Sequence, residues 1–207
     1  KSDFIGIKRA SEEIKDCKLF IDDTPGISIN ELRAKARRKK KEEDIKVIAI
    51  DYLQLMRSNS KQAQNSRERE VAEISAGLKG LAKELDIPII VLAQLNRGPE
   101  SRVGSSGGGG KPRMSDLRES GSIEQDADMV WFVYREDYYE AAKQPDPVNE
   151  AAHDAWKEKM ERIFGVAELI VAKQRHGSTG RVRMKFEAKI TRFTDLADDQ
   201  YADAGYD

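Results

Sequence analysis

The chain has 207 residues, and 35% of them are charged, but 36 Lys and Arg nearly cancel 37 Asp and Glu. A chain of this length suits one ordinary domain with a hydrophobic core, and its balanced charge means that any site for a polyanion must be local. The single cysteine, Cys17, excludes an internal disulfide and fits a reducing compartment. No apolar run approaches the roughly 18 residues that span a bilayer, and no signal peptide opens the chain, so we expect a soluble intracellular protein with no membrane partner.

The first part of the chain carries helix and strand signals in turn. Residues 1–15 resemble the end of a helix, and residues 18–24 (KLFIDDT) predict a strand that ends at a Pro-Gly turn. Ser28 and Glu31 form a capping box, which predicts that a helix begins there. This helix runs into a basic stretch, residues 33–41, that could hold phosphates. Acidic residues follow directly, so a solvated helix face is the favoured interpretation.

A short apolar run at residues 47–50 (VIAI) ends in Asp51. Such a run predicts a strand buried on both faces of a parallel sheet, and strands of this kind end near ligand crevices. A carboxylate at this point can hold Mg²⁺ through its water shell, because a small hard cation prefers oxygen ligands and keeps most of its waters. The alternative is an ordinary aspartate that caps the next turn, and this segment alone does not decide between them.

A helix and a second strand follow. The helix begins at Asn65 or Ser66, and its apolar residues recur three and four apart, as on one helix face. Residues 89–92 predict the strand, and Gln94 follows it. A right-handed crossover would bring the ends of both strands, with Asp51 and Gln94, to the same sheet edge. Gln94 could then contact a terminal phosphate or position the attacking water, although a glutamine that bonds loop backbone is an equally good interpretation.

Residues 97–114 include four successive glycines and predict a mobile loop. They do not form a phosphate-binding P-loop, because no G-K-S/T follows and no helix begins there. Hydrogen-bond donors, one carboxylate and a flexible glycine gather in the next stretch: Ser115, Arg118, Glu119, Ser120 and Gly121. This composition suits a phosphate backbone, while a helix cap with a salt bridge explains the same residues.

The last part of the chain predicts further strands around a helical insertion. Residues 129–134 and 167–172 are apolar strands, and the insertion between them, residues 138–164, is most simply an embellishment packed on the sheet. Lys173 and Arg175 follow the second strand and are either solvent-exposed or directed at an anion. The alternation RVRMKF then predicts a half-exposed antiparallel strand. The two histidines lack metal-ligand spacing, so they are interpreted as structural or solvated.

Five segments, taken together and in this order, resemble the DnaB-type replicative DNA helicase family: IAIDYLQLM, AQLNR, SDLRESGSIEQDAD, VAKQRHG and FEAKITRFTDL. The resemblance covers nearly the whole chain. It implies an α/β, RecA-like ATPase domain with a mostly parallel sheet flanked by helices and antiparallel strands near the C-terminus. It also implies homo-hexameric rings that bind ATP between neighbouring subunits and pull single-stranded DNA through the central channel. The implied activity is ATP-driven unwinding of duplex DNA at replication forks, in the bacterial cytoplasm, with primase and a helicase loader as partners.

The resemblance also implies roles for individual residues. Asp51 resembles the Walker-B aspartate, which holds Mg²⁺ through water, and Gln94 resembles the glutamine that senses the γ-phosphate. Lys173 and Arg175 resemble the lysine and the arginine finger that each subunit inserts into its neighbour's ATP site.

A second set of residues is implied to hold DNA. Arg118, Glu119 and Gly121 match the family's DNA-binding loop, which holds the strand's phosphates. Lys111 and Arg113 flank that loop and could add phosphate contacts, although no family motif fixes them.

The chain departs from the family pattern in one respect. The Walker-A loop, G-x-x-x-x-G-K-S/T, and the catalytic glutamate lie upstream of the similarity in the family, and neither occurs here, nor does the amino-terminal collar domain that usually engages primase. We therefore expect residues 1–207 to form a single partial RecA-like domain that is inactive alone. A non-catalytic RecA-like assembly or DNA-binding module is the alternative, although Asp51, Gln94 and Arg175 argue against it for the parent protein. A RecA- or RadA-type recombinase core is a third interpretation. It is disfavoured because those families do not share the Arg118 stretch in this form.

Overall fold

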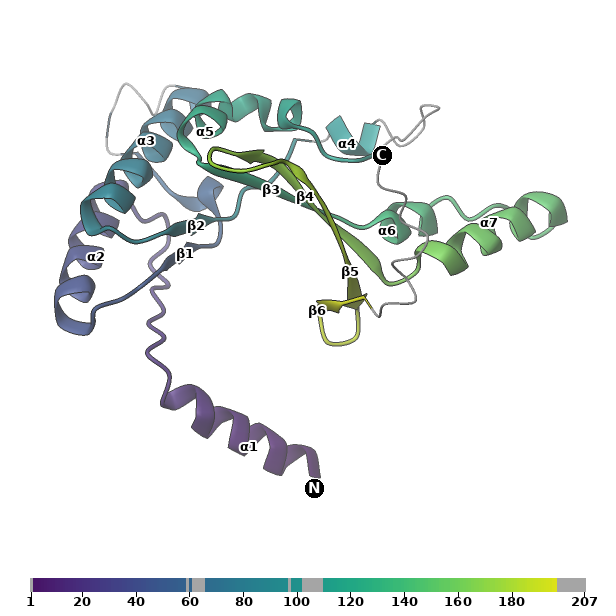
Figure 1. The fold of residues 1–207 in the computed structure, drawn as a ribbon, viewed down its shortest axis with the longest axis horizontal. Helices are drawn as coiled ribbons and strands as arrows, with labels where there is room; N and C mark the ends of the chain where they lie inside the picture. The colour runs from purple at the N-terminus through teal and green to yellow at the C-terminus, as the bar shows by residue number, and fades with distance from the viewer. Residues whose placement is uncertain (1, 59, 61–65, 97, 102–109, 197–207) are drawn as a thin grey trace. The chain divides into compact units, whose positions relative to one another are not determined.

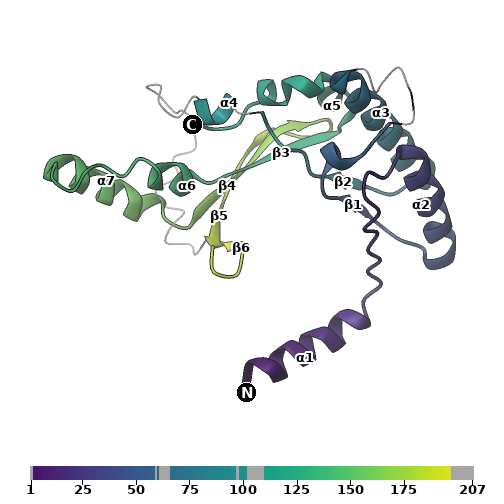
Figure 2. The same ribbon diagram turned by 180° about the vertical axis from the view of Figure 1, so that it is seen from behind.

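A computed structural model describes residues 2–58, 60, 66–96, 98–101 and 110–196. The chain divides into two compact units, Lys1–Gln94 with Ser120–Asp126, and Leu95–Glu119 with Ala127–Asp207. Figures 1 and 2 show the helices and strands of each unit. Within the described ranges, no helix is both long and apolar enough to cross a membrane.

The first unit is built on a β-α-β arrangement. Strands β1 (Ile48–Ile50) and β2 (Ile89–Val91) pair in parallel, and the chain between them forms the 3-10 helix η1 (Leu53–Leu55) and helix α3 (Arg67–Leu85). The unit's other helices are α1 (Ser2–Lys15), α2 (Ile29–Glu43) and α5 (Gly121–Asp126).

The core of this unit lies on the apolar stripe of α3. The buried side chains that pack together there are Ile29, Leu53, Met56, Val71, Ile74 and Leu78. Helix α3 also contacts α2 and α5, so one helix connects most of the unit. The three-and-four spacing in the sequence therefore identified the buried face of α3 correctly.

The capping box at the start of α2 is confirmed in part. Ser28 Oγ accepts a hydrogen bond from the Glu31 N–H at 3.3 Å, as a serine N-cap does. The Glu31 carboxylate lies 3.6 Å from Lys35 Nζ. Asp44 caps the C-terminal end of α2 in the left-handed conformation (φ 49°).

The basic run on α2 is largely neutralised by acidic neighbours. Lys35 pairs with Asp22 at 2.8 Å, Lys40 pairs with Asp44 at 2.7 Å, and Arg37 pairs with Glu84. Hydrogen bonds from Lys35 and Thr24 lower the pKa of Asp22 to about 2. These pairs support the interpretation of residues 33–41 as a solvated helix face.

The strand predicted at residues 18–24 is wrong. This segment is not a β-strand, and none of the described strands pairs with it, although a strand requires a ladder partner. Leu19 and Ile21 are exposed, and Asp22 instead closes a turn by accepting from the Thr24 N–H at 3.1 Å.

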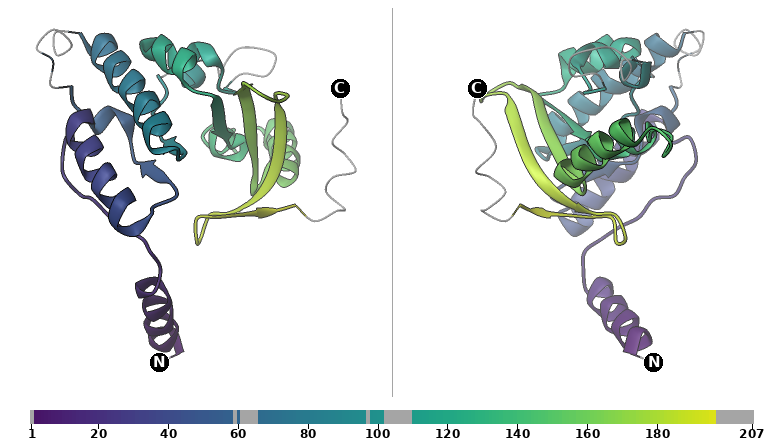
Figure 3. Two further views of the ribbon diagram at one scale, coloured as in Figure 1. Left: turned by 60° about the vertical axis from the view of Figure 1, so that its left-hand side comes forward. Right: turned by 90° about the vertical axis from the view of Figure 1, so that its right-hand side faces the viewer.

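The second unit is an antiparallel sheet with strand order β3-β4-β5-β6, seen clearly in Figure 3. Its strands are β3 (Met129–Tyr134), β4 (Val166–Gln174), β5 (Gly180–Glu187) and β6 (Arg192–Asp195). Its helices are α4 (Gly98–Ser101), the 3-10 helix η3 (Met114–Ser120), α6 (Glu136–Ala141) and α7 (Glu150–Ile163). Along β3, burial alternates: Val130, Phe132 and Tyr134 are buried and their neighbours are exposed.

The helical insertion reaches this sheet through α6. Helix α7 packs mainly against α6, and α6 contacts β4. Trp156 Nε1 donates to Glu140 O at 3.0 Å, and Lys159 Nζ donates to the Glu140 carboxylate at 2.8 Å. The insertion thus contacts the sheet through α6, and the aromatic and cationic side chains of the Trp156 helix contact α6.

Of the predicted loop at 97–114, residues 97 and 102–109 lie outside the described residues. The residues described at its C-terminal end have defined partners. Lys111 Nζ contacts both carboxylate oxygens of Glu168, at 2.8 and 2.7 Å, and the Arg113 N–H donates to the buried Asp116 at 2.7 Å.

Candidate functional site

Asp51 and Gln94 follow the same edge of the parallel sheet in the first unit. Ile50 lies opposite Val91, so β1 and β2 end side by side. The ladder continues one step further, because the Leu92 N–H donates to Ile50 O at 2.9 Å. The side chains of Asp51 and Gln94 are both exposed beyond this point, at the shared edge that the β-α-β crossover predicts. The Asp51–Tyr52 peptide bond is cis.

Gln54 contacts the main chain of Gln94 on both sides. Its Nε2 donates to Gln94 O at 3.0 Å, and its Oε1 accepts from the Gln94 N–H at 3.2 Å. Gln54 was not predicted as a site residue. The sequence offers only its position, three residues after Asp51, as a signal.

The carboxylate at this sheet edge suits a hydrated Mg²⁺ ion. Asp51 offers one exposed carboxylate, and the part of the chain that the structure describes contains no cluster of three or more His, Cys, Asp or Glu that could hold a metal by itself. Mg²⁺ usually takes one or two carboxylates, keeps several waters and completes its shell with substrate phosphates. Asp51 matches that pattern as a water-mediated ligand.

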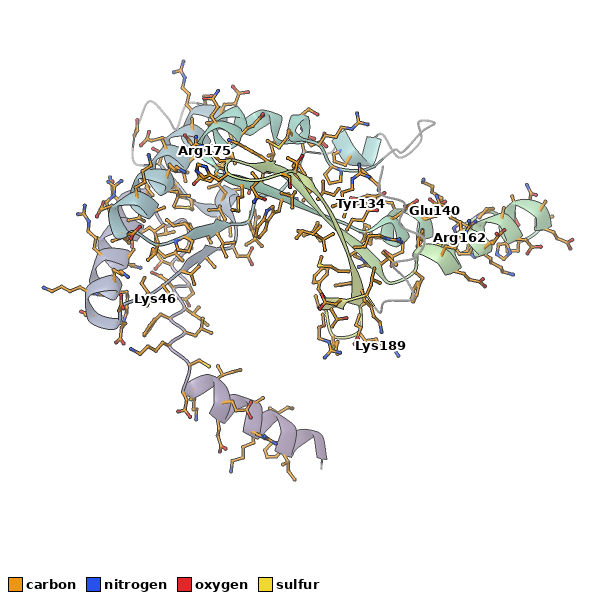
Figure 4. All side chains as sticks on the ribbon, viewed as in Figure 1. Lys46, Tyr134, Glu140, Arg162, Arg175 and Lys189 are labelled. Carbon is orange, nitrogen blue, oxygen red and sulfur yellow. The ribbon has the colours of Figure 1, made fainter. Side chains whose placement is uncertain are left out.

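Lys173 and Arg175 lie at the end of β4 in the second unit. Lys173 is opposite Val130 in the β3–β4 pair. Arg175, labelled in Figure 4, donates its main-chain N–H to Asp128 O at 2.9 Å and its Nη1 N–H to Asp128 Oδ1 at 3.2 Å. Asp128 was also missed by sequence reasoning. Its signal is the antiparallel pairing itself, which brings the residue before β3 beside the residue after β4.

The predicted DNA-binding residues are described only in part. Arg118 and Glu119 lie in η3, and their side chains are outside the described residues. Gly121 opens α5, and a Cβ added there would meet no atom within 4 Å. Packing therefore does not require glycine at this position.

Of the two flanking cations, one is exposed and one is paired. Arg113 is exposed, whereas the half-buried Lys111 holds Glu168 and lies 5.6 Å from the centroid of the Tyr134 ring. Burial, with the nearby carboxylates of Glu136 and Glu168, raises the pKa of Tyr134 to about 12. A contact between Lys111 and DNA phosphate would compete with this pairing.

The first unit thus combines a parallel strand pair with an acidic residue and a glutamine at its carboxyl edge, as expected for a nucleotide-binding α/β domain. Solved structures agree with this class. One solved ATPase domain matches with a TM-score of 0.76 and 34% identity over 95% of this chain and 61% of that chain. A DnaB-like replicative helicase, whose structure also concerns its interactions with primase, matches with a TM-score of 0.75 and 34% identity over 95% of this chain and 42% of that chain. The chain has a RecA-like ATPase fold.

Within that class, the chain belongs to the DnaB-like helicase C-terminal domain family, whose model matches residues 1–195. It is 43% identical over 190 residues to the replicative DNA helicase DnaB of Rickettsia conorii, and this match covers 92% of the chain and 37% of the relative. It is 41% identical over 205 residues to the replicative DNA helicase DnaC of Bacillus subtilis, covering 99% of this chain and 40% of the relative. The chain therefore spans less than half the length of these curated relatives.

Proposed function

We propose that the protein containing this chain is a replicative DNA helicase, a homo-hexameric ring that hydrolyses ATP, translocates on single-stranded DNA and unwinds the duplex at replication forks. Membership of the helicase family supports the reaction class. The observation that supports it most directly is the parallel β1–β2 pair, which carries Asp51 and Gln94 at one edge. The protein would act in the bacterial cytoplasm, with primase and a helicase loader as partners.

Asp51 and Gln94 are proposed to act on the nucleotide bound to their own subunit. The Asp51 carboxylate would hold a hydrated Mg²⁺ by accepting hydrogen bonds from the metal's water shell. A bound Mg²⁺ neutralises charge that develops on the phosphate oxygens. The Gln94 carboxamide has a donor and an acceptor, so it can contact the γ-phosphate and the attacking water together.

Lys173 and Arg175 are proposed to complete the ATP site of a neighbouring subunit. Their cationic groups would stabilise negative charge on the transferring phosphoryl group, an effect typically worth ~10³ to 10⁵ in rate for an arginine finger. A guanidinium suits this task because it presents several donors in a fixed plane. Asp128 would hold Arg175 until the neighbour's phosphate takes over the contact.

Arg118, Glu119 and Gly121 are proposed to hold the phosphates of single-stranded DNA. A motor that moves over any sequence should grip the backbone, because base edges carry the sequence information. The exposed Arg113 can add a phosphate contact. Lys111 is the weaker candidate of the two flanking cations, because its ammonium group is held by Glu168.

The 207-residue chain alone is proposed to turn over ATP negligibly. Asp51 can orient a metal only when other groups hold the triphosphate, and the sequence contains no G-K-S/T for that purpose. DNA-stimulated turnover by the purified chain at the rate of a complete helicase would contradict this.

The experiment for the proposed function substitutes the two edge residues in the parent protein. Asp51→Asn and Gln94→Ala should abolish DNA-stimulated phosphate release and duplex unwinding while the ring still assembles. Asp86→Asn is the matched control, because Asp86 is exposed in the same unit and has a left-handed conformation (φ 51°) that asparagine tolerates. Unchanged hydrolysis in both edge variants would contradict the proposal and favour a different site. A wild-type ring that binds DNA without any hydrolysis would favour the non-catalytic module.

A further inference from the structure

Gln54 and Gln94 are joined by two hydrogen bonds that run in opposite directions. The Gln54 carboxamide donates to the Gln94 carbonyl at 3.0 Å and accepts from the Gln94 N–H at 3.2 Å, so one side chain satisfies both backbone groups of one residue. The flipped carboxamide would place oxygen against oxygen and donor against donor, so one orientation alone satisfies both contacts.

This clamp begins where the β-sheet ladder ends. The last ladder contacts are the Leu92 N–H donating to Ile50 O at 2.9 Å and the Leu53 N–H donating to Leu92 O at 2.8 Å. Gln94 lies two residues beyond Leu92, and its side chain is exposed. The carboxamide of Gln54 thus restrains the main chain two residues beyond the end of the ladder, at Gln94.

Gln54 is itself held by the start of α3. Arg67 Nη2 donates to Gln54 O at 2.9 Å, and Arg67 also pairs with Glu70. Glu70 Oε1 accepts from the Ser58 N–H at 3.1 Å, so the same carboxylate ties the chain after η1 to α3. A continuous set of polar contacts therefore runs from the first turn of α3 through Gln54 to Gln94.

We propose that Gln54 is a positioning residue for ATP hydrolysis: it fixes the main chain of Gln94 so that the Gln94 carboxamide meets the γ-phosphate in one geometry. This inference rests on the proposed function of Gln94. Gln54 acts through Gln94 and contacts neither the nucleotide nor the metal. Because a displacement of about 1 Å in a catalytic group can cost ~100-fold in rate, loss of the clamp should lower kcat on the order of 10- to 100-fold.

Two substitutions in the parent protein distinguish the effect of the two hydrogen bonds from the effect of having any polar side chain at position 54. Gln54→Met keeps the length of the side chain and removes both hydrogen bonds. Gln54→Glu keeps the acceptor for the Gln94 N–H but sets a carboxylate oxygen against the Gln94 carbonyl. The glutamate variant should therefore be as slow as the methionine variant or slower. Gln144→Ala, at an exposed glutamine between α6 and α7, is the control and should match wild type.

Nucleotide binding gives a readout that loss of folding would not produce. ADP has no γ-phosphate, so its affinity should stay within about twofold of wild type in both Gln54 variants, while the preference for ATP over ADP and kcat fall. Thermal unfolding of the variants is measured alongside. An equal loss of ADP and ATP affinity, together with a lower Tm, would overturn the proposal in favour of a structural role.

A double-substitution cycle with Gln94→Ala tests the route through Gln94. The alanine variant keeps the backbone groups that Gln54 holds but has no carboxamide to position. If Gln54 acts through Gln94, Gln54→Met should cause no further loss of the preference for ATP over ADP in this background, a quantity that stays measurable when hydrolysis is lost. A further loss of this preference in the double variant overturns the inference. So does wild-type kcat in Gln54→Met beside an inactive Gln94→Ala enzyme. Either result leaves the proposed role of Gln94 intact. An active Gln94→Ala enzyme overturns both.

Discussion

Arg175 and Asp128 contact each other twice, although they are 47 residues apart in the sequence. The Arg175 N–H donates to the Asp128 carbonyl at 2.9 Å, and the guanidinium donates to the Asp128 carboxylate at 3.2 Å. The first contact fixes the main chain at the end of β4, and the second directs the side chain. Both side chains remain about half exposed, at 49% and 50%, so the guanidinium can exchange this carboxylate for another anion.

Removing the Asp128 carboxylate should affect catalysis more than stability. An ion pair as exposed as this one typically contributes about 0–1 kcal/mol, so Asp128→Ala should shift the free energy of unfolding by no more than about 1 kcal/mol. In the parent protein, the loss of orientation at Arg175 should lower kcat about 3- to 10-fold. Glu158→Ala, which removes the exposed i,i+4 partner of Arg162, should change neither quantity. Steady-state phosphate release and thermal unfolding measure the two effects, and wild-type turnover in Asp128→Ala would show that the pair does not orient Arg175.

Arg118→Ala should weaken DNA binding by the parent ring equally for different base compositions. Each phosphate neutralised on a single strand contributes about 0.7 to the slope of log K against log salt, so the slope should flatten by about that amount. Fluorescence anisotropy at several salt concentrations measures it. Arg162→Ala, at an exposed arginine on α7, should leave the slope unchanged. A loss confined to one base composition, or no loss, would return Arg118 to the helix-cap interpretation.

Gly121→Ala tests whether a phosphate backbone approaches α5 closely. A Cβ at this position meets no atom within 4 Å in the protein, so the substitution should leave Tm unchanged or slightly raised. If DNA phosphate lies against the glycine, affinity for single-stranded DNA should still fall severalfold. Gly6→Ala on α1 is the matched control, because a Cβ there also meets no atom within 4 Å. Equal DNA affinity in the two variants would exclude close approach at Gly121.

The contact between α6 and α7 should weaken in acid because of Glu140 (Figure 4). Burial by itself would raise the pKa of Glu140, but hydrogen bonds from Lys159 and Lys143 outweigh it and lower the pKa from its ordinary 4.5. A lowered pKa gives stability that is fully present above pH 4.5 and is lost as the pH falls through the folded-state value.

Trp156 fluorescence can follow this titration in a Trp131→Phe background. Emission should change below pH 4.5 in the otherwise native protein. Glu140→Gln cannot ionise, so it should lose this pH dependence and weaken the α6–α7 contact at neutral pH by about 0.5–1 kcal/mol. Glu158→Gln is the control and should keep the acid transition. An identical acid transition in Glu140→Gln would assign the effect to another group.

Local patterns predicted much of the fold. The buried stripe of α3, the Ser28 cap and the strand at Met129–Tyr134 each depend on residues that are close in sequence, and each prediction is confirmed. The strand predicted at residues 18–24 failed because a strand also needs a partner, which its own residues do not specify.

The supporting residues of the candidate site could not be predicted in the same way. Gln54 and Gln94 are 40 residues apart, and Asp128 and Arg175 are 47 apart. The Asp128–Arg175 contact follows from the β3–β4 register, and the Gln54–Gln94 contact follows from the position of η1 beside the chain after β2. The sequence pattern provides neither. Sequence reasoning therefore found the residues proposed to act on the nucleotide and missed those that hold them in place.

Mixed rings of two inactive parent proteins test most directly the claim that the ATP site is shared between subunits. Asp51→Asn removes a group from its own subunit's site, and Arg175→Ala removes a group from the neighbour's. Where an Arg175→Ala subunit has an Asp51→Asn neighbour in the correct order, the interface between them has both native groups. Phosphate release should therefore rise above that of either variant alone and peak at intermediate mixing ratios. Rings that remain inactive at every ratio, while energy transfer between labelled subunits demonstrates exchange, would contradict the account.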